Sequence, residues 1–266
     1  MLQQHVYLAV QTLKKTPHLH IIQIGDDFAS SSYISRKQDM GKQLGIEVTH
    51  HHFNLNENAD TIKQVMVDII AQKDGVIVQL PVPTQFQPII HSVPWFCDVD
   101  LLGLEANKSW DNGIVPPTIA AIDMVLKDIL NLHINNTLDT SMLNLQGKNV
   151  AVIGQGVLVG NPLLRYLRDR EATILSINKN TQNPQSITKL ADIVITGAGV
   201  PGLIDKNWLK DDAIVIDAAT SESNNKLVGD IDYKNLPEHV TVCPSPGGVG
   251  PLTVLSLFYN LILLGK

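Results

Sequence analysis

The stretch IIQIGDDFASSSYISRK (residues 21–37) reads as a buried strand, a turn and the first half of a helix. Ser30 or Ser31 is expected to cap the helix, because serine hydroxyls bond free backbone N–H groups at helix starts. Ser30, Tyr33 and Lys37 then lie at i, i+3 and i+7 and share one helix face. A desolvated lysine loses affinity for its proton and can act as an acid or base near neutral pH. The alternative is an ordinary solvated helix with a surface lysine.

The first half of the chain continues this alternation of strands and helices. Strands are expected at 19–24, 47–53 and 75–80, and helices at 30–44 and 58–72. Such alternation is typical of βαβ units with a mainly parallel sheet, and ligands of these sheets bind beyond the carboxyl ends of the strands. Gln79 precedes Pro81 at such an end, so the sequence predicts an amide side chain there.

A second α/β unit begins at Lys148. Its first strand, expected at 149–153, is followed by Gly154, Gly156 and Gly160, which give the spacing G-x-G-x-x-x-G. This is one residue longer than the dinucleotide-binding pattern, in which glycines let the backbone approach a pyrophosphate at a helix N-terminus. A plain tight turn is the alternative interpretation.

The residues that follow the later strands help to distinguish NADP from NAD as the dinucleotide. The strand expected at 173–177 is followed by Lys179 and carries no acid. An acid there would hold the ribose hydroxyls and repel a phosphate, so its absence favours NADP over NAD. The strands expected at 192–196 and 213–217 end in small or turn residues, which leave room for a flat cofactor beside Thr196 and Gly197.

The segment from Pro244 to Pro251 holds three prolines and three glycines in eight residues. Such a composition predicts an irregular loop that comes close to other groups, because proline removes a backbone donor and glycine permits unusual dihedrals. A final apolar helix is expected over residues 253–264.

Size, charge and cysteine content narrow the class of protein. The chain has 266 residues, 44% of them hydrophobic, which fits a globular protein with a proper core. Its net charge of −6 argues against a nucleic-acid partner, and no stretch resembles a signal peptide or a membrane span. Cys97 and Cys243 are expected to be free thiols in a reducing cytoplasm.

The sequence contains two groups of possible metal ligands, and no metal is expected at either. Adjacent strand residues point to opposite faces, so only His50 and His52 of the run His50–His52 share a side. The acids Asp98 and Asp100 lack the rest of a calcium loop. A turn with one buried, hydrogen-bonded aspartate is the preferred interpretation there.

Six stretches together carry a resemblance to a known family. They are GDDFASSSYISRK (25–37), GVIVQLPVP (75–83), DVD (98–100), VIGQGVLVGNPL (152–163), KLVGDID (226–232) and PGGVGPLT (246–253). In this order they resemble the bifunctional methylenetetrahydrofolate dehydrogenase/methenyltetrahydrofolate cyclohydrolase family (FolD type), and the likeness runs over nearly the whole chain.

The resemblance implies two α/β lobes with a folate cleft between them. The N-terminal catalytic lobe has a mainly parallel sheet, the second lobe is a Rossmann-type NAD(P)-binding domain, and the C-terminal helix packs back on the first lobe. The implied bounds are 1–118 with 250–266 for the folate-binding catalytic domain, and 119–249 for the NAD(P)-binding domain. The family also implies a homodimer.

The resemblance further implies an activity and a set of site residues. The enzyme would oxidise methylenetetrahydrofolate with NADP and hydrolyse the resulting methenyltetrahydrofolate to formyltetrahydrofolate. The implied catalytic residues are Lys37, its partner Gln79, the folate-packing Tyr33 and the pterin-binding Asp100. Ser30, Pro246, Gly247 and Gly248 would line the same folate site. The residues expected at the cofactor are Gly154, Gln155, Gly156, Gly160, Lys179, Thr196 and Gly197.

Two departures from the family pattern leave alternatives open. Gln155 stands where the family's G-R-S loop has an arginine for the NADP 2′-phosphate, and Lys179 would compensate only as a point charge, so NAD remains an alternative. Leu101 stands at a family glycine. The competing hypotheses are a monofunctional NAD-dependent dehydrogenase and a non-catalytic folate- or cofactor-binding relative. The presence of both Lys37 and Gln79 favours the bifunctional enzyme.

Overall fold

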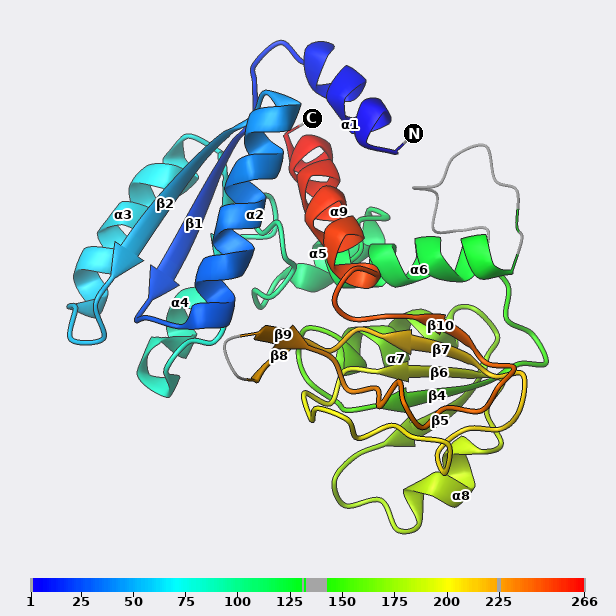
Figure 1. The fold of residues 1–266 in the computed structure, drawn as a ribbon. Helices are drawn as coiled ribbons and strands as arrows, with labels where there is room; N and C mark the ends of the chain where they lie inside the picture. Colours follow the sequence, from blue (N-terminus) through cyan, green and yellow to red (C-terminus); the bar gives the residue numbers. More distant parts are fainter. Residues whose placement is uncertain (1, 131, 133–142, 224–225, 266) are drawn as a thin grey trace. The chain divides into compact units, whose positions relative to one another are not determined.

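The computed structural model describes residues 2–130, 132, 143–223 and 226–265. The chain divides into two compact units, Met1–Pro117 with Val254–Lys266, and Thr118–Thr253. Each unit has its own parallel sheet (Figure 1) and its own apolar core.

The first unit is built on a three-stranded parallel sheet in the order β2-β1-β3. The strands are β1 (His18–Ile24), β2 (Glu47–Phe53) and β3 (Gly75–Val78). They are connected by α2 (Phe28–Leu44) and α3 (Ala59–Ala71). The parallel βαβ arrangement expected from the sequence is confirmed, and it gathers the carboxyl ends of the strands at one edge of the sheet.

The two faces of this sheet pack against different helices. Ile21 and Ile77 belong to a core that includes side chains of α1 (Leu2–Gln11), α2 and α9 (Val249–Leu264). Ile22 and Val76 belong to a second core with α3 and α4 (Gln87–His91). The division follows from the two-residue alternation of side chains along a strand.

The C-terminal helix α9 packs on the first unit, as expected. Phe258 and Leu261 are buried in the core with α1 and α2, and the Asn260 amide donates to the carbonyls of Val99 and Val115 at 3.2 and 2.9 Å. The helix begins at Val249, however, four residues before the expected start. Proline is tolerated in the first turn of a helix, where the N–H that it lacks has no partner in any case, so the end of the Pro244–Pro251 segment is helical rather than irregular.

The second unit contains a five-stranded parallel sheet in the order β10-β7-β6-β4-β5. Its strands are β4 (Asn149–Ile153), β5 (Thr173–Ile177), β6 (Ile193–Thr196), β7 (Ile214–Asp217) and β10 (Thr241–Cys243). Three helices accompany them, α6 (Pro117–Ile129), α7 (Gly160–Arg168) and α8 (Pro184–Thr188). The mainly parallel α/β class predicted from the sequence is therefore confirmed in this unit as well.

Some local features differ from the sequence-based expectations. The antiparallel pair β8 (Ser221–Ser223) and β9 (Lys226–Val228) was not anticipated, and neither were the short helices η1 (Thr84–Phe86) and α5 (Ala106–Asp111). Strands of three residues carry too little periodicity to be recognised. The sequence also favours a loop over the polar residues 135–147, most of which lie outside the described residues. Across the part of the chain that the structure describes, no helix combines the length and apolar character needed to cross a membrane.

Candidate active site

The helix α2 starts with a side-chain cap, but not the expected one. Asp27 is the N-cap residue, and its Oδ1 accepts from the backbone N–H of Ser30 at 2.7 Å. The expectation that Ser30 or Ser31 caps the helix is wrong, because aspartate caps equally well and stands one turn earlier. Ser30 is instead buried, and its hydroxyl donates to the carbonyl of Leu80 at 2.9 Å. The first turn of α2 is thereby attached to the segment that follows β3.

The buried Lys37 pairs with the half-buried Gln79 at the carboxyl end of the first sheet. The Lys37 side chain comes from α2 and is only 6% exposed, and its Nζ donates to Gln79 Oε1 at 2.9 Å. Gln79 follows β3, and its Nε2 donates to the carbonyl of Leu80 at 3.0 Å, which fixes the amide with its oxygen toward Lys37. The sequence-based expectation that these two side chains lie together agrees with the observed distance.

Burial sets the protonation of Lys37. Removal from water lowers the pKa of Lys37 below its usual value of 10.5, and the nearby Asp100 carboxylate partly opposes this by favouring the ammonium. Burial raises the pKa of Asp100, while Lys37 acts in the opposite direction. Lys37 therefore gains access to its neutral form, in which Nζ still donates to Gln79 and has a lone pair that can accept a proton.

The turn from residue 98 to residue 103 holds Asp100 in position. Asp98 is buried, and its Oδ2 accepts from the backbone N–H of Gly103 at 2.7 Å, which confirms the expected turn with one buried aspartate. Burial raises the pKa of Asp98 to about 7, against the opposing effect of its backbone hydrogen bonds. Leu101, at the position of a family glycine, has a left-handed backbone with φ of 58°. A leucine there costs roughly 1 kcal/mol of strain that glycine would avoid.

Tyr33 lies one turn before Lys37 on α2 and is partly exposed. The Arg36 guanidinium lies 5.7 Å from the centre of its ring, within the range of a cation–π contact. One ring face of Tyr33 is therefore next to a cation.

The glycines after β4 permit very close backbone approach in the second unit. Gly154 has φ of 90°, and a Cβ there would lie 2.7 Å from the Gly197 carbonyl oxygen. A Cβ at Gly160, the first residue of α7, would lie 2.0 Å from the Gly154 carbonyl oxygen. Gly156 has nothing within 4 Å of its Cβ position, so its backbone is open to a ligand. The geometry is that of a loop from a strand to a helix N-terminus, where pyrophosphate binds.

Gln155 reaches the end of the next strand. Its Nε2 donates to Ser176 Oγ at 2.5 Å, and its Oε1 accepts from the Asn178 amide at 3.3 Å. Lys179 is exposed in the turn that follows β5. A neutral amide thus occupies the position of the family arginine, and Lys179 is the cation next along the chain.

Thr196 and Gly197 close β6 beside a buried carboxylate. The Thr196 hydroxyl, fully buried, donates to Asp230 Oδ2 at 2.6 Å, and the same oxygen accepts from the Ala198 N–H at 2.8 Å. Asp230 Oδ1 accepts from the Val200 N–H at 2.7 Å. The Thr196 side chain is therefore engaged within the protein, and Asp230 shapes the loop after β6.

The residues Pro246, Gly247 and Gly248 follow β10 in the second unit. Gly247 has φ of 106°, and a Cβ on Gly248 would lie 2.4 Å from Cys243 Sγ. The preceding Ser245 is held by Ala219, whose carbonyl accepts from its hydroxyl at 2.6 Å. Glycine is required at both positions, by dihedral in one case and by space in the other.

The histidine run on β2 divides between the two faces of its sheet. His50 and His52 stack with ring centroids 5.9 Å apart, and His50 Nε2 lies 2.9 Å from Gln23 Oε1. His51 points the other way and bonds His20 at 3.0 Å between Nε2 and Nδ1. The expected alternation is confirmed. Both cysteines are free, as expected, and both are buried.

Sequence reasoning missed two carboxylates that organise the second unit. They are Asp230, which shapes the loop after β6, and Asp217, which accepts from the backbone N–H groups of Ala219 and Ile231, each at 3.1 Å. Burial raises the pKa of Asp217 to about 6, partly offset by these bonds. Asp230 lies within the KLVGDID stretch, directly after Gly229 and before Ile231, so an acid between a glycine and an apolar residue was the available signal.

Comparison with known proteins gives one consistent family. Residues 1–100 match the model described as "Tetrahydrofolate dehydrogenase/cyclohydrolase, catalytic domain", and residues 131–266 match its "NAD(P)-binding domain". The "Bifunctional protein FolD" of Acholeplasma laidlawii is 35% identical over 99% of this chain and 94% of its own length.

Solved structures agree with the sequence comparison. The bifunctional enzyme FolD from Campylobacter jejuni, a methylenetetrahydrofolate dehydrogenase/cyclohydrolase, superposes with a TM-score of 0.87 at 26% identity, covering 100% of this chain and 94% of its own. The Trypanosoma brucei enzyme complexed with NADP cofactor and inhibitor has a TM-score of 0.86 at 25% identity, covering 99% and 93%.

Proposed function

The chain belongs to the tetrahydrofolate dehydrogenase/cyclohydrolase family, and on that premise we propose that Lys37 performs the proton transfers of its hydrolytic reaction while Gln79 positions the Lys37 amine. The protein oxidises methylenetetrahydrofolate to methenyltetrahydrofolate with NADP and hydrolyses the product to formyltetrahydrofolate. The observation that supports the assignment is the 2.9 Å bond between the buried Lys37 Nζ and Gln79 Oε1.

Lys37 acts in both halves of the hydrolysis. As water adds to the methenyl carbon, neutral Nζ takes one of its protons, and the resulting ammonium returns that proton to the ring nitrogen when the carbon–nitrogen bond breaks. The second water proton is released to solvent, so one formyl group forms and one proton leaves overall. A base whose pKa is lowered by burial suits this exchange, because its neutral form is reached more readily than that of an exposed lysine.

Gln79 is a positioning residue in this mechanism. Its carbonyl oxygen accepts one Nζ hydrogen, and its own amide is fixed by the Leu80 carbonyl. Nζ is therefore held in one orientation, which reduces the entropy lost in reaching the transition state. Tyr33 packs on the folate and Asp100 holds the pterin, with Ser30 lining the same site.

The glycine loop of the second unit fits NADP. The backbones of Gly154, Gly160 and Gly197 come so close together that side chains would clash, and Gly156 leaves its surroundings open. When bound, NADP supplies the hydride acceptor for the dehydrogenase reaction. We assign Gly154, Gln155, Gly156 and Gly160 to its pyrophosphate side. Lys179 meets the 2′-phosphate, and Gly197 borders the cofactor together with the backbone of Thr196.

The remaining assignments follow the family. The folate-binding catalytic domain comprises residues 1–118 and 250–266, and the NAD(P)-binding domain comprises residues 119–249. Pro246, Gly247 and Gly248 contribute to the folate site. The enzyme is a cytoplasmic homodimer with tetrahydrofolate derivatives as its small-molecule partners. The net charge of −6 supports the absence of nucleic acid among its partners.

Substitution of Lys37 by methionine tests the proposal. Lys37→Met keeps the length of the side chain but removes the proton acceptor, so cyclohydrolase kcat should fall by about 10²–10⁴-fold while the variant still binds folate. Lys42→Met, which alters an exposed lysine of the same helix, is the matched control and should leave the rate unchanged. Unchanged hydrolysis in Lys37→Met would reject the assigned role.

One alternative is a dehydrogenase that uses NAD. The neutral Gln155 is the specific observation that supports it. Initial rates with NADP and NAD in one titration decide between the cofactors. We expect lower KM with NADP, and Lys179→Ala should raise it several-fold, since an exposed charge contributes about 0.5–1 kcal/mol. A lower KM for NAD in the wild type would favour the alternative.

A further inference from the structure

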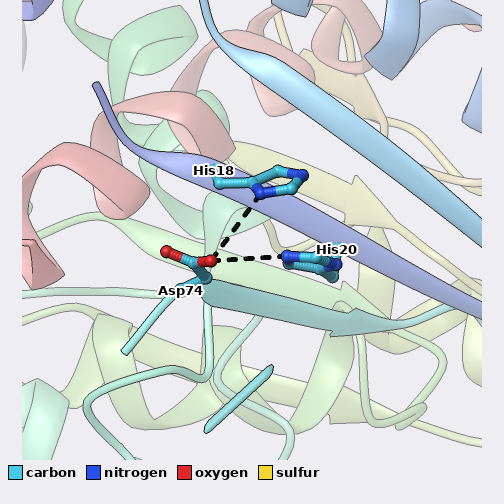
Figure 2. A group of neighbouring side chains, drawn as sticks. All are labelled: His18, His20 and Asp74. Carbon is cyan, nitrogen blue, oxygen red and sulfur yellow. Dashed lines mark ion pairs between the residues drawn. The ribbon is translucent and has the colours of Figure 1, made fainter. Parts of the chain in front are cut away.

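His18, His20 and Asp74 form a cluster at the amino ends of β1 and β3, and we propose that it binds one divalent transition-metal ion of the Zn²⁺ class (Figure 2). Figure 2 shows both imidazoles directed at the same carboxylate oxygen. We call these three residues the amino-end cluster. Asp74 precedes β3 and Gln79 follows it, so the cluster is about 16 Å along the strand from the Lys37 pair.

The spacing of the three ligand atoms suits a tetrahedral ion. His18 Nδ1 and His20 Nε2 lie 3.7 and 3.5 Å from Asp74 Oδ2, and all three atoms lie within 4.8 Å of one another. Ligands about 2.0–2.1 Å from a tetrahedral Zn²⁺ are about 3.3–3.4 Å apart. Small side-chain adjustments therefore suffice to bring all three atoms into coordination, with a fourth position left for water.

His20 has an unused polar atom that points into this space. Its Nε2 is buried without a hydrogen-bond partner, and its side chain is 9% exposed. The 3.5 Å separation from Asp74 Oδ2 is too long for a good hydrogen bond. An unpartnered buried polar atom is destabilising unless something binds it, and a metal ion at the cluster would satisfy it.

The outer ring nitrogens of both histidines are already bonded. His18 Nε2 lies 2.8 Å from Thr49 Oγ1, and His20 Nδ1 lies 3.0 Å from His51 Nε2. When the imidazoles donate these bonds, their N–H groups are on the outer nitrogens, and the lone pairs of His18 Nδ1 and His20 Nε2 face Asp74. Metal-ligating histidines almost always have such an outer partner, which fixes the tautomer.

The surrounding charges are compatible with a cation. Asp74 is the buried anion, and the single cation paired with it, among the ion pairs of the described residues, is Lys15, whose Nζ contacts the other oxygen, Oδ1, at 3.1 Å. The Lys15 side chain is 71% exposed and can turn into solvent when a dication binds.

Zn²⁺ at this cluster would join the starts of two strands. Leu19 of β1 pairs with Gly75 of β3, so His18 and Asp74 are one residue outside this pair on adjacent strands. Coordination would cross-link the amino ends of β1 and β3, at the end of the sheet opposite Lys37 and Gln79. The expected consequence is a more stable first unit, with no direct part in the chemistry.

Zinc titration of chelator-treated full-length protein tests the proposal. We expect one Zn²⁺ bound per chain, a higher Tm with Zn²⁺, and visible absorption of a tetrahedral site with Co²⁺. Asp74→Asn and His20→Gln should weaken Zn²⁺ binding by more than about 100-fold, and Thr49→Val, which removes only an outer hydrogen bond, by about 10-fold. His52→Gln is the matched control, because it alters a histidine on the opposite face of β2 and should leave the affinity unchanged.

NMR of the histidine rings in the wild-type protein locates the bound Zn²⁺ without any variant. The test therefore stands even if a variant fails to fold. Zn²⁺ should shift the ring signals of His18, His20 and His51 and leave those of exposed His91 in place. The proposal is overturned if wild type binds no Zn²⁺, if Asp74→Asn binds it as tightly as wild type, or if the shifts occur at His50 and His52 instead.

Discussion

The two ends of the three-stranded sheet in the first unit bury titratable side chains in different ways. At the carboxyl end, Lys37 reaches in from α2 and meets one neutral acceptor, Gln79. At the amino end, His18 and His20 come from the strand itself and face the carboxylate of Asp74. At the carboxyl end a single base is hydrogen-bonded to a neutral amide, with the Asp100 carboxylate nearby, whereas at the amino end two histidines face one carboxylate oxygen.

The difference shows how burial can serve distinct chemistry. Burial lowers the pKa of Lys37 and of His20 alike, because low dielectric disfavours a cation. Lys37 retains a hydrogen-bonded orientation, which suits proton transfer at a fixed place. His20 has a buried ring nitrogen, Nε2, that has no hydrogen-bond partner and lies beside a carboxylate, which suits a metal ion.

The largest effect at the carboxyl end, short of removing Lys37, is expected from Gln79→Leu. This change removes the acceptor that orients Nζ and leaves the amine buried without its partner. Loss of such a hydrogen bond is worth about 1.5–3 kcal/mol, so cyclohydrolase kcat should fall about 10–100-fold. Gln72→Leu, at the exposed C-cap of α3, is the control in the same steady-state assay. A wild-type rate in Gln79→Leu would show that Lys37 does not need its bonded partner, and the contrast in how the two ends orient their bases would be lost.

At the amino end, His20→Gln should flatten the dependence of stability on pH. The pKa of His20 is about 4 in the folded state and 6.5 when unfolded, so between these values the unfolded chain binds more protons. His20 therefore stabilises the fold above about pH 6.5, and this contribution of about 2–3 kcal/mol is lost as the pH falls toward 4.

Urea unfolding at pH 4.5 and pH 7 in the presence of a chelator measures this difference. Asp98, whose pKa is raised to about 7, has the opposite sign because a raised carboxyl pKa favours the fold at low pH. The relevant quantity is therefore the pH-dependent gap between wild type and His20→Gln, which share Asp98. His91→Gln should follow the wild type. A gap that is constant with pH would show that His20 is not buried as a neutral ring.

The smallest expected effect is a shift of the pH–rate profile in Asp100→Asn. The Asp100 carboxylate raises the pKa of Lys37, so its removal lowers that pKa further. The rising limb of cyclohydrolase kcat should then move to lower pH. The pH dependence of kcat should be measured, because weaker pterin binding by the variant would raise KM and change kcat/KM. Movement of the limb to higher pH would contradict the assigned interaction.

The sequence predicted the fold well where periodicity was long and regular. Strands β4 and β5 have the expected bounds, and α2 ends as expected at Leu44 before Gly45, whose φ of 73° suits a glycine C-cap. The start of α2 was misplaced because Asp27 competes with Ser30 and Ser31 as a cap. The start of α9 was misplaced because Pro251 was interpreted as ending regular structure rather than as a first-turn residue.

The candidate site was predictable to the extent that strand ends can be recognised. Gln79 could be placed at the carboxyl end of its strand, and the helix spacing placed Lys37 on a face with Ser30. The amino-end cluster could not be found in this way, because it depends on the register of Leu19 with Gly75 and on the outer contacts of Thr49 and His51. The run His50–His52 is conspicuous in the sequence because its histidines are adjacent, whereas His18 and His20 are separated by one residue and Asp74 is far along the chain.

Direct titration of the Lys37 amine by NMR, with the signal assigned by its absence in Lys37→Met, tests proton transfer at the carboxyl end most closely. Because Nζ is buried and bonded to Gln79, its midpoint should lie below the usual value of 10.5. A midpoint at or above 10.5 would mean that Lys37 remains an ammonium at neutral pH, and it would contradict the role of this residue as the base in hydrolysis.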